Sequence, residues 1–417
     1  MYTLKSRRLF AFINQGTLSL AAMTLLLSLD MLAGPFRYYS SLLGLESLVY
    51  LPKVMCLLVL FFEFLSGRCS RFLCVVLLWL GASSVLGVIN GTGLQAVAFA
   101  FFALLPFLFG LISPHYLLVH EKYFVGLVAV VFAVTAAGVF IDYAIDFPWK
   151  GFVYSLNNAE IEGSREWTTM GLERVAGFTR LSASAGCYLV CTALFLFSYC
   201  RSVALRCLIV SLAFPALLAT TNKASILGFV CGLLVSMVPA WLCQLRKILV
   251  LLLGGVGVVL PVSVLFHTYA LDLDDAASML VLSSFEDRLV NTWPGFLSAV
   301  SHYGNPVTGV GFGAVGPGAK YFAEGNQAVF AFADNFALYL YGCFGIAAVA
   351  IYLFIAQIAL GLYASPGPLQ RSLAPVLVAL LAASLTTDVI SSQIFALLLG
   401  IALAMWNSSR PPCAGGL

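Results

Sequence analysis

Long apolar runs recur along the whole chain, and they constrain its fold more than any other feature. Runs of about 18 or more mostly apolar residues are each long enough to cross a hydrocarbon core as a helix. Hydrophobic residues make up 61% of the sequence and charged residues only 9%, which leaves too little polar surface to cover a soluble globule. Because lipid offers the backbone no hydrogen-bonding partners, such spans must be helices. The sequence therefore predicts an all-α, polytopic integral membrane protein.

The pattern predicts about twelve transmembrane helices. Pro52 and Lys53 lie within the second run and the last two runs are close together, so the pattern also fits a count that differs by one or two. The predicted spans lie near 9–29, 46–66, 72–90, 93–113, 123–145, 181–199, 203–220, 224–243, 246–267, 333–361, 373–389 and 391–407.

Basic residues indicate the orientation, because short cytoplasmic segments carry an excess of Lys and Arg. If the N-terminal MYTLKSRR is cytoplasmic, more than half of the 21 basic residues fall in cytoplasmic tails and turns. Among the acidic residues only Glu121 and Glu63 fall there. We expect both termini on this side and no tail that binds nucleic acid. The first run, followed by Asp30 without a small-residue cleavage site, is expected to be a span rather than a removed signal peptide.

Two connections, 146–180 and 268–332, are much longer than the others. Both fall on the outer face, so we expect one helical membrane domain, 1–417, with two loops folded over its outer mouth. Binding and catalytic residues concentrate in such loops. Neither loop contains a cysteine, although the chain has 11, and we therefore expect no disulfide framework and no zinc site.

Aromatic residues are mixed with acids and amides in the first loop, and the mixture has two interpretations. Trp149, Phe152, Tyr154 and Trp167 would suit the faces of sugar rings. They also suit a membrane interface, where Trp and Tyr gather in any case. The interface is the simpler interpretation of the two.

The second loop contains an amphipathic, helix-like pattern and a glycine-rich turn. The pattern runs from Ser283 to Ser301 and is stopped by Gly304 and Pro306. The GFGAVG segment that follows matches G-x-G-x-x-G, but no strand–helix unit surrounds it, so we interpret it as a tight turn rather than a dinucleotide site. The acidic DLDD at 272–275 is interpreted as solvated rather than as a divalent-metal site.

Four cations are the sharper signal: Arg174, Arg180, Lys223 and Arg288. All four are expected at the outer membrane face, where charges are costly unless they are paired or functional. Arginine forms bidentate hydrogen bonds with phosphate and lysine adds a point charge. Four such cations around one site would suit a pyrophosphate carried on a lipid.

The alternative for these cations is ordinary surface pairing. They would then pair with Glu173, Glu286 and Asp287, or extend to lipid head groups. The residue types alone do not separate this alternative from a diphosphate site.

Four segments occur in the order ERVAGFTRLSASAGCYL, TTNKASILGF, FEDRLVNTWPGFLSAVSHYGNPVTGVGFG and ADNFALYLYGCFG. As an ordered set over roughly 170–350, they resemble the O-antigen polymerase and O-antigen ligase superfamily of bacterial envelope glycosyltransferases. The resemblance implies a GT-C-like helical bundle in the bacterial inner membrane, with its active loops in the periplasm. It also implies a donor glycan on undecaprenyl pyrophosphate, and neither a metal nor a cofactor.

The resemblance assigns expected roles to individual residues. The pyrophosphate-binding cations would be Arg174, Arg180, Lys223 and Arg288, where Asn222-Lys223 replaces the Ser-Arg of the family. Ligases resemble one another in a His-Asn pair before the span after the long loop, and this chain has Asp334-Asn335. The missing histidine favours a polymerase, which transfers the glycan to the next lipid-linked repeat unit, over a ligase, which transfers it to lipid A–core.

The expected catalytic residues are Arg288 and Asp334. Asp334 would position or deprotonate the acceptor hydroxyl, or it would instead cap the next helix. Asn335, His302 and Tyr321 are the candidates for positioning the glycan or the acceptor. A chain-length-regulating protein is a possible partner. A transporter or flippase of a lipid-linked glycan is the alternative from another class, although transporters bind near the midplane and use broken helices.

Overall fold

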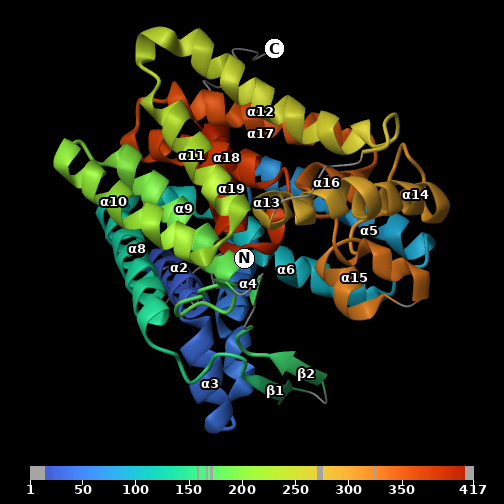
Figure 1. The fold of residues 1–417 in the computed structure, drawn as a ribbon, viewed down its shortest axis with the longest axis horizontal. Helices are drawn as coiled ribbons and strands as arrows, with labels where there is room; N and C mark the ends of the chain where they lie inside the picture. The colour runs from blue at the N-terminus through green and yellow to red at the C-terminus, as the bar shows by residue number, and fades with distance from the viewer. Residues whose placement is uncertain are drawn as a thin grey trace, which may run out of the picture.

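The computed structural model describes residues 15–156, 159–165, 168–169, 172–269, 276–323 and 325–408. In these ranges the regular secondary structure is helical apart from two short hairpins in the first loop (Figure 1). The helices outside the two loops are α2 (Gln15–Met31), α3 (Ala33–Leu42), η1 (Glu46–Tyr50), α4 (Leu51–Leu65), α5 (Arg71–Ile89), α6 (Leu94–Ile112), α7 (Pro114–Val119), α8 (Glu121–Ala144), α9 (Ser182–Tyr199), α10 (Val203–Thr220), α11 (Lys223–Met237), η2 (Ala240–Leu242), α12 (Cys243–Ser263), α16 (Phe336–Phe344), α17 (Ala347–Tyr363), α18 (Pro368–Ala383), η5 (Val389–Ser391) and α19 (Gln393–Ser408).

Seven helices of the described chain are long and apolar enough to cross a membrane, and the bent pair α2–α3 would make an eighth. The fold class is therefore confirmed as all-helical with several candidate spans. The count of about twelve and the GT-C-like arrangement stay predictions, because α11, α17, α18 and α19 are shorter. The predicted span 333–361 is two helices, α16 and α17, which are separated at Gly345 with φ +59°.

A sharp bend separates α2 from α3, and a proline explains it. The two helix axes differ by 87°. Pro35 lies in the first turn of α3, where its missing N–H costs nothing, but its ring would clash with the carbonyl four residues earlier if the helix ran on. That residue is Met31, where α2 ends. The chain therefore turns, and α3 is held by a hydrogen bond from the Gly34 N–H to the Phe178 carbonyl, 2.9 Å long.

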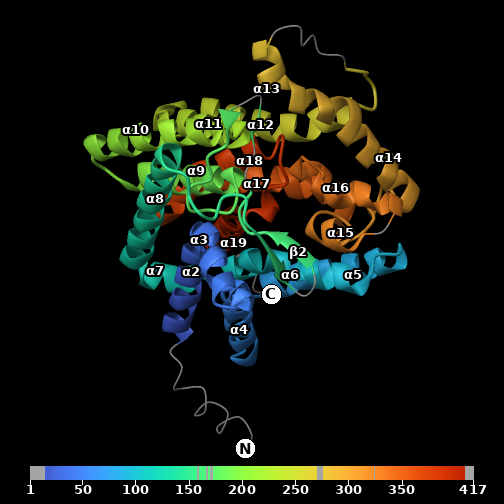
Figure 2. The same cartoon turned by 60° about the horizontal axis from the view of Figure 1, so that its bottom comes forward.

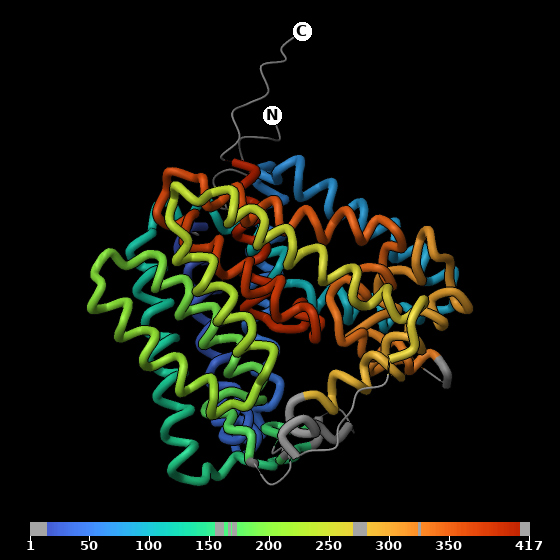
Figure 3. The backbone as a smooth tube through the Cα atoms, turned by 45° about the horizontal axis from the view of Figure 1, so that its top comes forward, coloured from blue at the N-terminus to red at the C-terminus, as the bar shows by residue number. Residues whose placement is uncertain are grey.

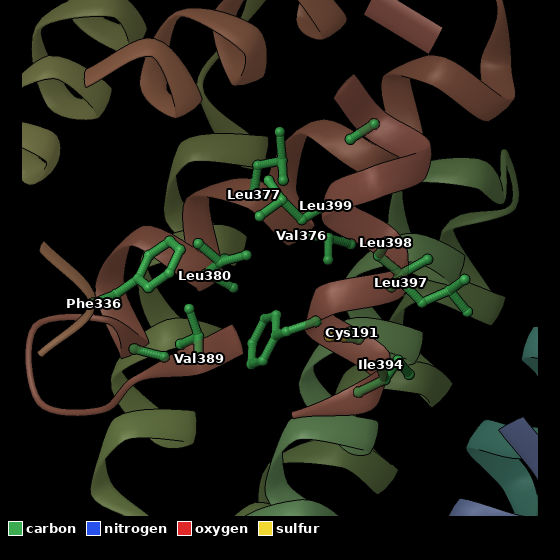
Figure 4. Close-up of a cluster of buried hydrophobic side chains, with 14 of the residues drawn as sticks. Cys191, Phe336, Val376, Leu377, Leu380, Val389, Ile394, Leu397, Leu398 and Leu399 are labelled. Atoms are coloured by element: carbon green, nitrogen blue, oxygen red, sulfur yellow. The ribbon is translucent and has the colours of Figure 1, made fainter. Parts of the chain in front are cut away.

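The core is deepest around α18, which packs against α9, α11 and α17, and around α19, which packs against α6. Every residue of α18 from Ser372 to Ala383 is buried, as expected for a helix that is apolar all round. Figure 4 shows this core, in which Leu380 of α18 lies beside Phe336 of α16, and Leu377 of α18 lies near Leu399 of α19. The helices at the centre of the molecule are thus protein-covered rather than exposed to lipid.

The first loop forms two hairpins, and an ion-pair network fastens it to α8. The strands are β1 (Val153–Leu156) with β2 (Ala159–Glu162), and β3 (Thr168–Thr169) with β4 (Leu172–Glu173). Lys150 lies 3.0 Å from both Asp142 and Asp146 and also pairs with Glu173. Figures 1 and 2 place the β1–β2 hairpin near α3, to which it is joined by a 2.9 Å hydrogen bond from Arg37 Nη1 to Tyr154 Oη.

The second loop is largely helical and lies on the opposite side of the molecule from α8 and α10, as Figure 3 shows. Its elements are α13 (Ala276–Asp287), the π-helical turn η3 (Arg288–Thr292), α14 (Trp293–Tyr303), α15 (Pro317–Phe322) and η4 (Gly325–Ala331). The predicted helix over 283–301 is therefore present but interrupted by the π turn. Pro294 is the second residue of α14 and has no N–H to donate, which favours the irregular hydrogen bonding just before it.

The glycine-rich turn packs against the membrane helices, as the tight-turn interpretation requires. Gly311 has φ +115°, and a Cβ there would lie 2.3 Å from the Gly87 N atom of α5. Ser83 of α5 accepts a 2.9 Å hydrogen bond from the Phe312 N–H and donates to the Cys343 carbonyl. Glycine is needed here both for its positive φ and for the close approach of two backbones. The turn thereby fixes the second loop against α5 and α16.

Candidate active site

An ion pair joins the second loop to the segment before α16. Arg288 Nε lies 3.4 Å from Asp334 Oδ2, and the two side chains are 17% and 34% exposed. Arg288 also donates through Nη1 to the carbonyl and hydroxyl oxygens of Ser284, at 2.7 and 2.8 Å. The predicted alternative, pairing of Arg288 with its neighbours Glu286 or Asp287, is not what the structure shows. Asp287 instead accepts from Asn291 at 2.8 Å.

Asp334 has the conformation and environment of a functional carboxylate. Its backbone has φ +50°, which is rare for a residue with a side chain and is found mostly where other contacts enforce it. Burial raises the pKa of its carboxyl group, Arg288 opposes the rise, and Asp287 adds to it. A carboxylate with a raised pKa is a better proton acceptor than one in water.

Asn335, not Asp334, caps α16. Asn335 Oδ1 accepts from the Leu338 N–H at 2.9 Å, and Nδ2 donates to the carbonyls of Gly257 and Leu385. The side chain is fully buried, so its polar atoms are used within the fold. The capping role that was weighed for Asp334 therefore belongs to Asn335, and a role of Asn335 in positioning the glycan stays a prediction.

Two further cations are linked to Arg288 electrostatically, Lys223 directly and Arg174 through Lys223. The pKa of Lys223 is lowered by burial and then by electrostatic repulsion from Arg174 and Arg288. Lys223 is the first residue of α11, whose N-terminus is capped by Asn222 through a 3.3 Å hydrogen bond from the Ser225 N–H. Burial also lowers the pKa of Arg174. Lys223 therefore interacts with cations from two other segments, and one of them, Arg288, pairs with Asp334.

The turn that carries Arg174 is held from both sides. Asp142 Oδ2 accepts from the N–H groups of Ala176 and Gly177 at 3.0 and 2.8 Å, and the Val175 N–H donates to the Ala219 carbonyl at the end of α10. Gly177 has φ +63°, and a Cβ there would meet the α8 backbone at 2.9 Å. This anchoring brings Arg174 beside the α10–α11 connection.

Arg180 is directed elsewhere. Its Nε donates to the Glu162 carbonyl at 3.0 Å, and it acts electrostatically on Arg37 of α3. The prediction of one site with four cations is therefore changed. Lys223 interacts electrostatically with Arg174 and Arg288, whereas Arg180 lies with the β1–β2 hairpin and α3.

Two other predicted residues do not lie with this cluster. His302 is exposed near the end of α14 and packs on Tyr303; it is 14 residues after Arg288, or about 20 Å along a helix that rises 1.5 Å per residue. Tyr321 is 51% exposed and contacts Phe99 of α6 edge to face. Neither contact supports a role in positioning the glycan.

Asp388 was missed by the sequence reasoning. It lies in the connection between α18 and α19, which is tied to the Asp334 segment by a hydrogen bond from the Phe336 N–H to the Ser384 carbonyl. Burial raises its pKa to about 7, Asp334 adds to the rise, and Lys320 opposes it. The available signal was a single acid between two long apolar runs.

A scan against models of protein families and a search of curated proteins found no match to this chain. Among the described residues there is also no group of three or more His, Cys, Asp or Glu side chains that could hold a metal ion.

Proposed function

We propose that this protein is a polymerase of lipid-linked oligosaccharide repeat units of an O-antigen or exopolysaccharide. It would act in the bacterial inner membrane with both termini cytoplasmic and the two loops periplasmic. The observation that carries the proposal is the Arg288–Asp334 ion pair together with the electrostatic interaction of Lys223 with Arg288 and Arg174. Arginine forms bidentate hydrogen bonds with phosphate and lysine adds a point charge, and a polyprenyl diphosphate would bring phosphate groups to these side chains.

The chemistry requires only these side chains. The acceptor hydroxyl oxygen attacks the anomeric carbon, the bond from that carbon to the diphosphate oxygen breaks, and the oxygen keeps the electron pair. Asp334 takes the hydroxyl proton. The three cations stabilise the charge that develops on the diphosphate, and each donor contributes about 3 kcal/mol, or roughly a hundredfold in rate.

Asp334 also supports polymerase over ligase, because it stands where the ligases that the chain resembles have a histidine. His302 lies near the end of α14, where it packs on Tyr303. A ligase acting on lipid A–core would use the same donor and is the first alternative. A transporter or flippase is the second alternative, and the observation in its favour is the broken α2–α3 pair with Asp30 at the bend.

The lipid-linked glycans of a strain lacking this protein separate the three functions. Single repeats capping the core mean a polymerase, long chains left on the carrier mean a ligase, and repeats trapped in the cytoplasm mean a flippase. Complementation with Arg174→Ala or Arg288→Ala is expected to restore protein but not long chains. Arg165→Ala is the matched control, because that side chain is 44% exposed and its Nε lies 3.5 Å from a carboxylate oxygen of Glu162. Normal chain lengths in both test variants would refute the proposal.

A further inference from the structure

A second group of charged side chains lies at the α2–α3 bend, apart from Asp334. Asp30 is in the last turn of α2, Arg37 is on α3 and Lys53 is in the first turn of α4. Both cations interact electrostatically with Asp30, and Arg180 interacts with Arg37. We call Asp30, Arg37, Lys53 and Arg180 the bend cluster. It contains three cations and one carboxylate.

The carboxylate of the bend cluster is occupied by neutral donors. Tyr188 Oη donates to Asp30 Oδ2 at 2.8 Å, and Gln393 Nε2 donates to Oδ1 at 2.7 Å. In the part of the chain that the structure describes, no ion pair within 4.0 Å joins Asp30 to Arg37 or Lys53. Asp30 therefore does not use up the hydrogen-bonding capacity of the cations.

The donors of the bend cluster are only partly used. Arg37 Nη1 donates to Tyr154 Oη, but Arg37 Nε and the nearby Trp149 Nε1 are buried without a hydrogen-bonding partner. Trp149 packs directly against Gly34 of the same helix. The Lys53 ammonium lies 4.5 Å from the centre of the Phe102 ring. Buried donors are normally satisfied, so this set indicates an anionic, oxygen-rich ligand.

An apolar groove lies on two of the same helices, α2 and α3. It has a volume of about 320 Å³ and runs between the end of α2, one face of α3 and η1. Its lining includes Leu32, Pro35, Phe36, Leu45 and Leu48. Leu29 of the groove adjoins Asp30 in sequence, and Phe36 adjoins Arg37. An anion site and an apolar channel on one bent helix suit a single amphipathic molecule, a lipid with a diphosphate head.

We call Asp334, Arg288, Lys223 and Arg174 the Asp334 cluster. We propose that the bend cluster is a second lipid-diphosphate site, which holds the acceptor repeat unit while the Asp334 cluster holds the donor. This inference rests on the proposed function. A polymerase joins two substrates that carry the same prenyl diphosphate, so it needs two sites of the same chemistry. Arg37 and Lys53, with Trp149 Nε1, bind the diphosphate, and the prenyl chain lies in the groove.

Native mass spectrometry of the full-length protein with undecaprenyl diphosphate tests this inference. The wild type is expected to bind two lipids. Arg37→Gln is expected to weaken one of the two by about tenfold or more, since a charge-assisted hydrogen bond is lost, and Arg174→Gln to weaken the other. Arg68→Gln is the matched control, because Arg68 contacts Gln15 at the far end of α2. Leu48→Trp, which fills the exposed groove without touching a polar contact, is expected to act like Arg37→Gln.

Each outcome separates this inference from the proposed function. One bound lipid in the wild type, or two that Arg37→Gln and Leu48→Trp leave unchanged, overturns the second site and leaves the polymerase proposal standing. No bound lipid diphosphate at all contradicts the proposed function itself. Equal occupancy of the bend cluster by phosphatidylglycerol would show a general head-group site and would also overturn the inference.

Discussion

The two charged clusters differ in what their carboxylate contacts. In the Asp334 cluster the carboxylate pairs with a cation and is about one-third exposed. In the bend cluster Asp30 is bonded to the neutral donors Tyr188 and Gln393. A paired, accessible carboxylate beside cations suits proton transfer during catalysis. A carboxylate held by neutral groups leaves its neighbouring cations available for binding. The same residue types therefore serve different steps because their partners differ.

The largest effect is expected from a substitution in the glycine-rich turn, which anchors the second loop and therefore Arg288. Gly311→Ala is expected to destabilise the protein by about 3–5 kcal/mol, because it adds overpacking to a strained positive φ. Gly126→Ala in α8 has open space around its Cβ and is expected to be neutral or stabilising by up to about 1 kcal/mol. Thermal unfolding in detergent measures both. Equal melting temperatures would show that the turn does not fix the second loop.

Kinetics with separated donor and acceptor sharpen the comparison next. Arg288→Ala is expected to lower kcat by about a hundredfold, or about 3 kcal/mol, because it removes stabilisation of the leaving diphosphate. Arg37→Gln is expected to raise KM for the acceptor by about tenfold with kcat unchanged. If Arg37→Gln lowered kcat and Arg288→Ala raised only KM, the bend cluster would be the catalytic one and the Asp334 cluster the binding one.

A smaller effect on stability distinguishes the adjacent residues Asn335 and Asp334. Asn335→Ala is expected to cost about 2 kcal/mol of stability, because it removes a helix cap and leaves the Gly257 and Leu385 carbonyls without this donor. Asp334→Asn is expected to leave stability nearly unchanged while turnover falls by about a hundredfold. Unfolding and turnover measured on the same preparations test both expectations. Unchanged turnover in Asp334→Asn would remove the base from the mechanism.

The smallest expected effect is a pH dependence on the Asp334 side, at Asp388. Because the pKa of Asp388 is raised to about 7, its contribution to stability is present below about pH 4 and is lost as the pH rises through 7. Asp334 and Lys320 face it from other segments, as does Tyr339 of α16. Asp388→Asn should therefore raise the melting temperature by a few degrees at pH 8 relative to pH 5. A parallel shift at both pH values would contradict this.

Much of the helical framework could be predicted, because each apolar run must be a helix in lipid. Its interruptions were harder to predict. Pro35 and Gly345 end helices within or beside apolar runs, and hydropathy alone does not detect a backbone break. The shorter α18 and α19 are buried by other helices rather than by lipid, and sequence composition does not distinguish these two apolar surroundings.

The candidate site was predicted in part. Arg174, Lys223, Arg288 and Asp334 were named from the sequence. The structure pairs Arg288 with Asp334, and Lys223 interacts electrostatically with Arg174 and Arg288. Arg180 was assigned to the same group because it is close to Arg174 in sequence, but the turn at Gly177 sends it to the hairpin. Asn335 was predicted to position the glycan because of its motif. Its amide forms hydrogen bonds with the Leu338 N–H and with two backbone carbonyls.

The sequence by itself determined that this chain is helical, apolar and rich in cations at the ends of its helices, because these properties follow from local composition and from the solvent that composition requires. Only the tertiary structure decided which charges meet. Asp30 meets Gln393 and Arg288 meets Asp334 because packing brings distant segments together. The partner of a charge, and hence its chemical role, is a property of that packing.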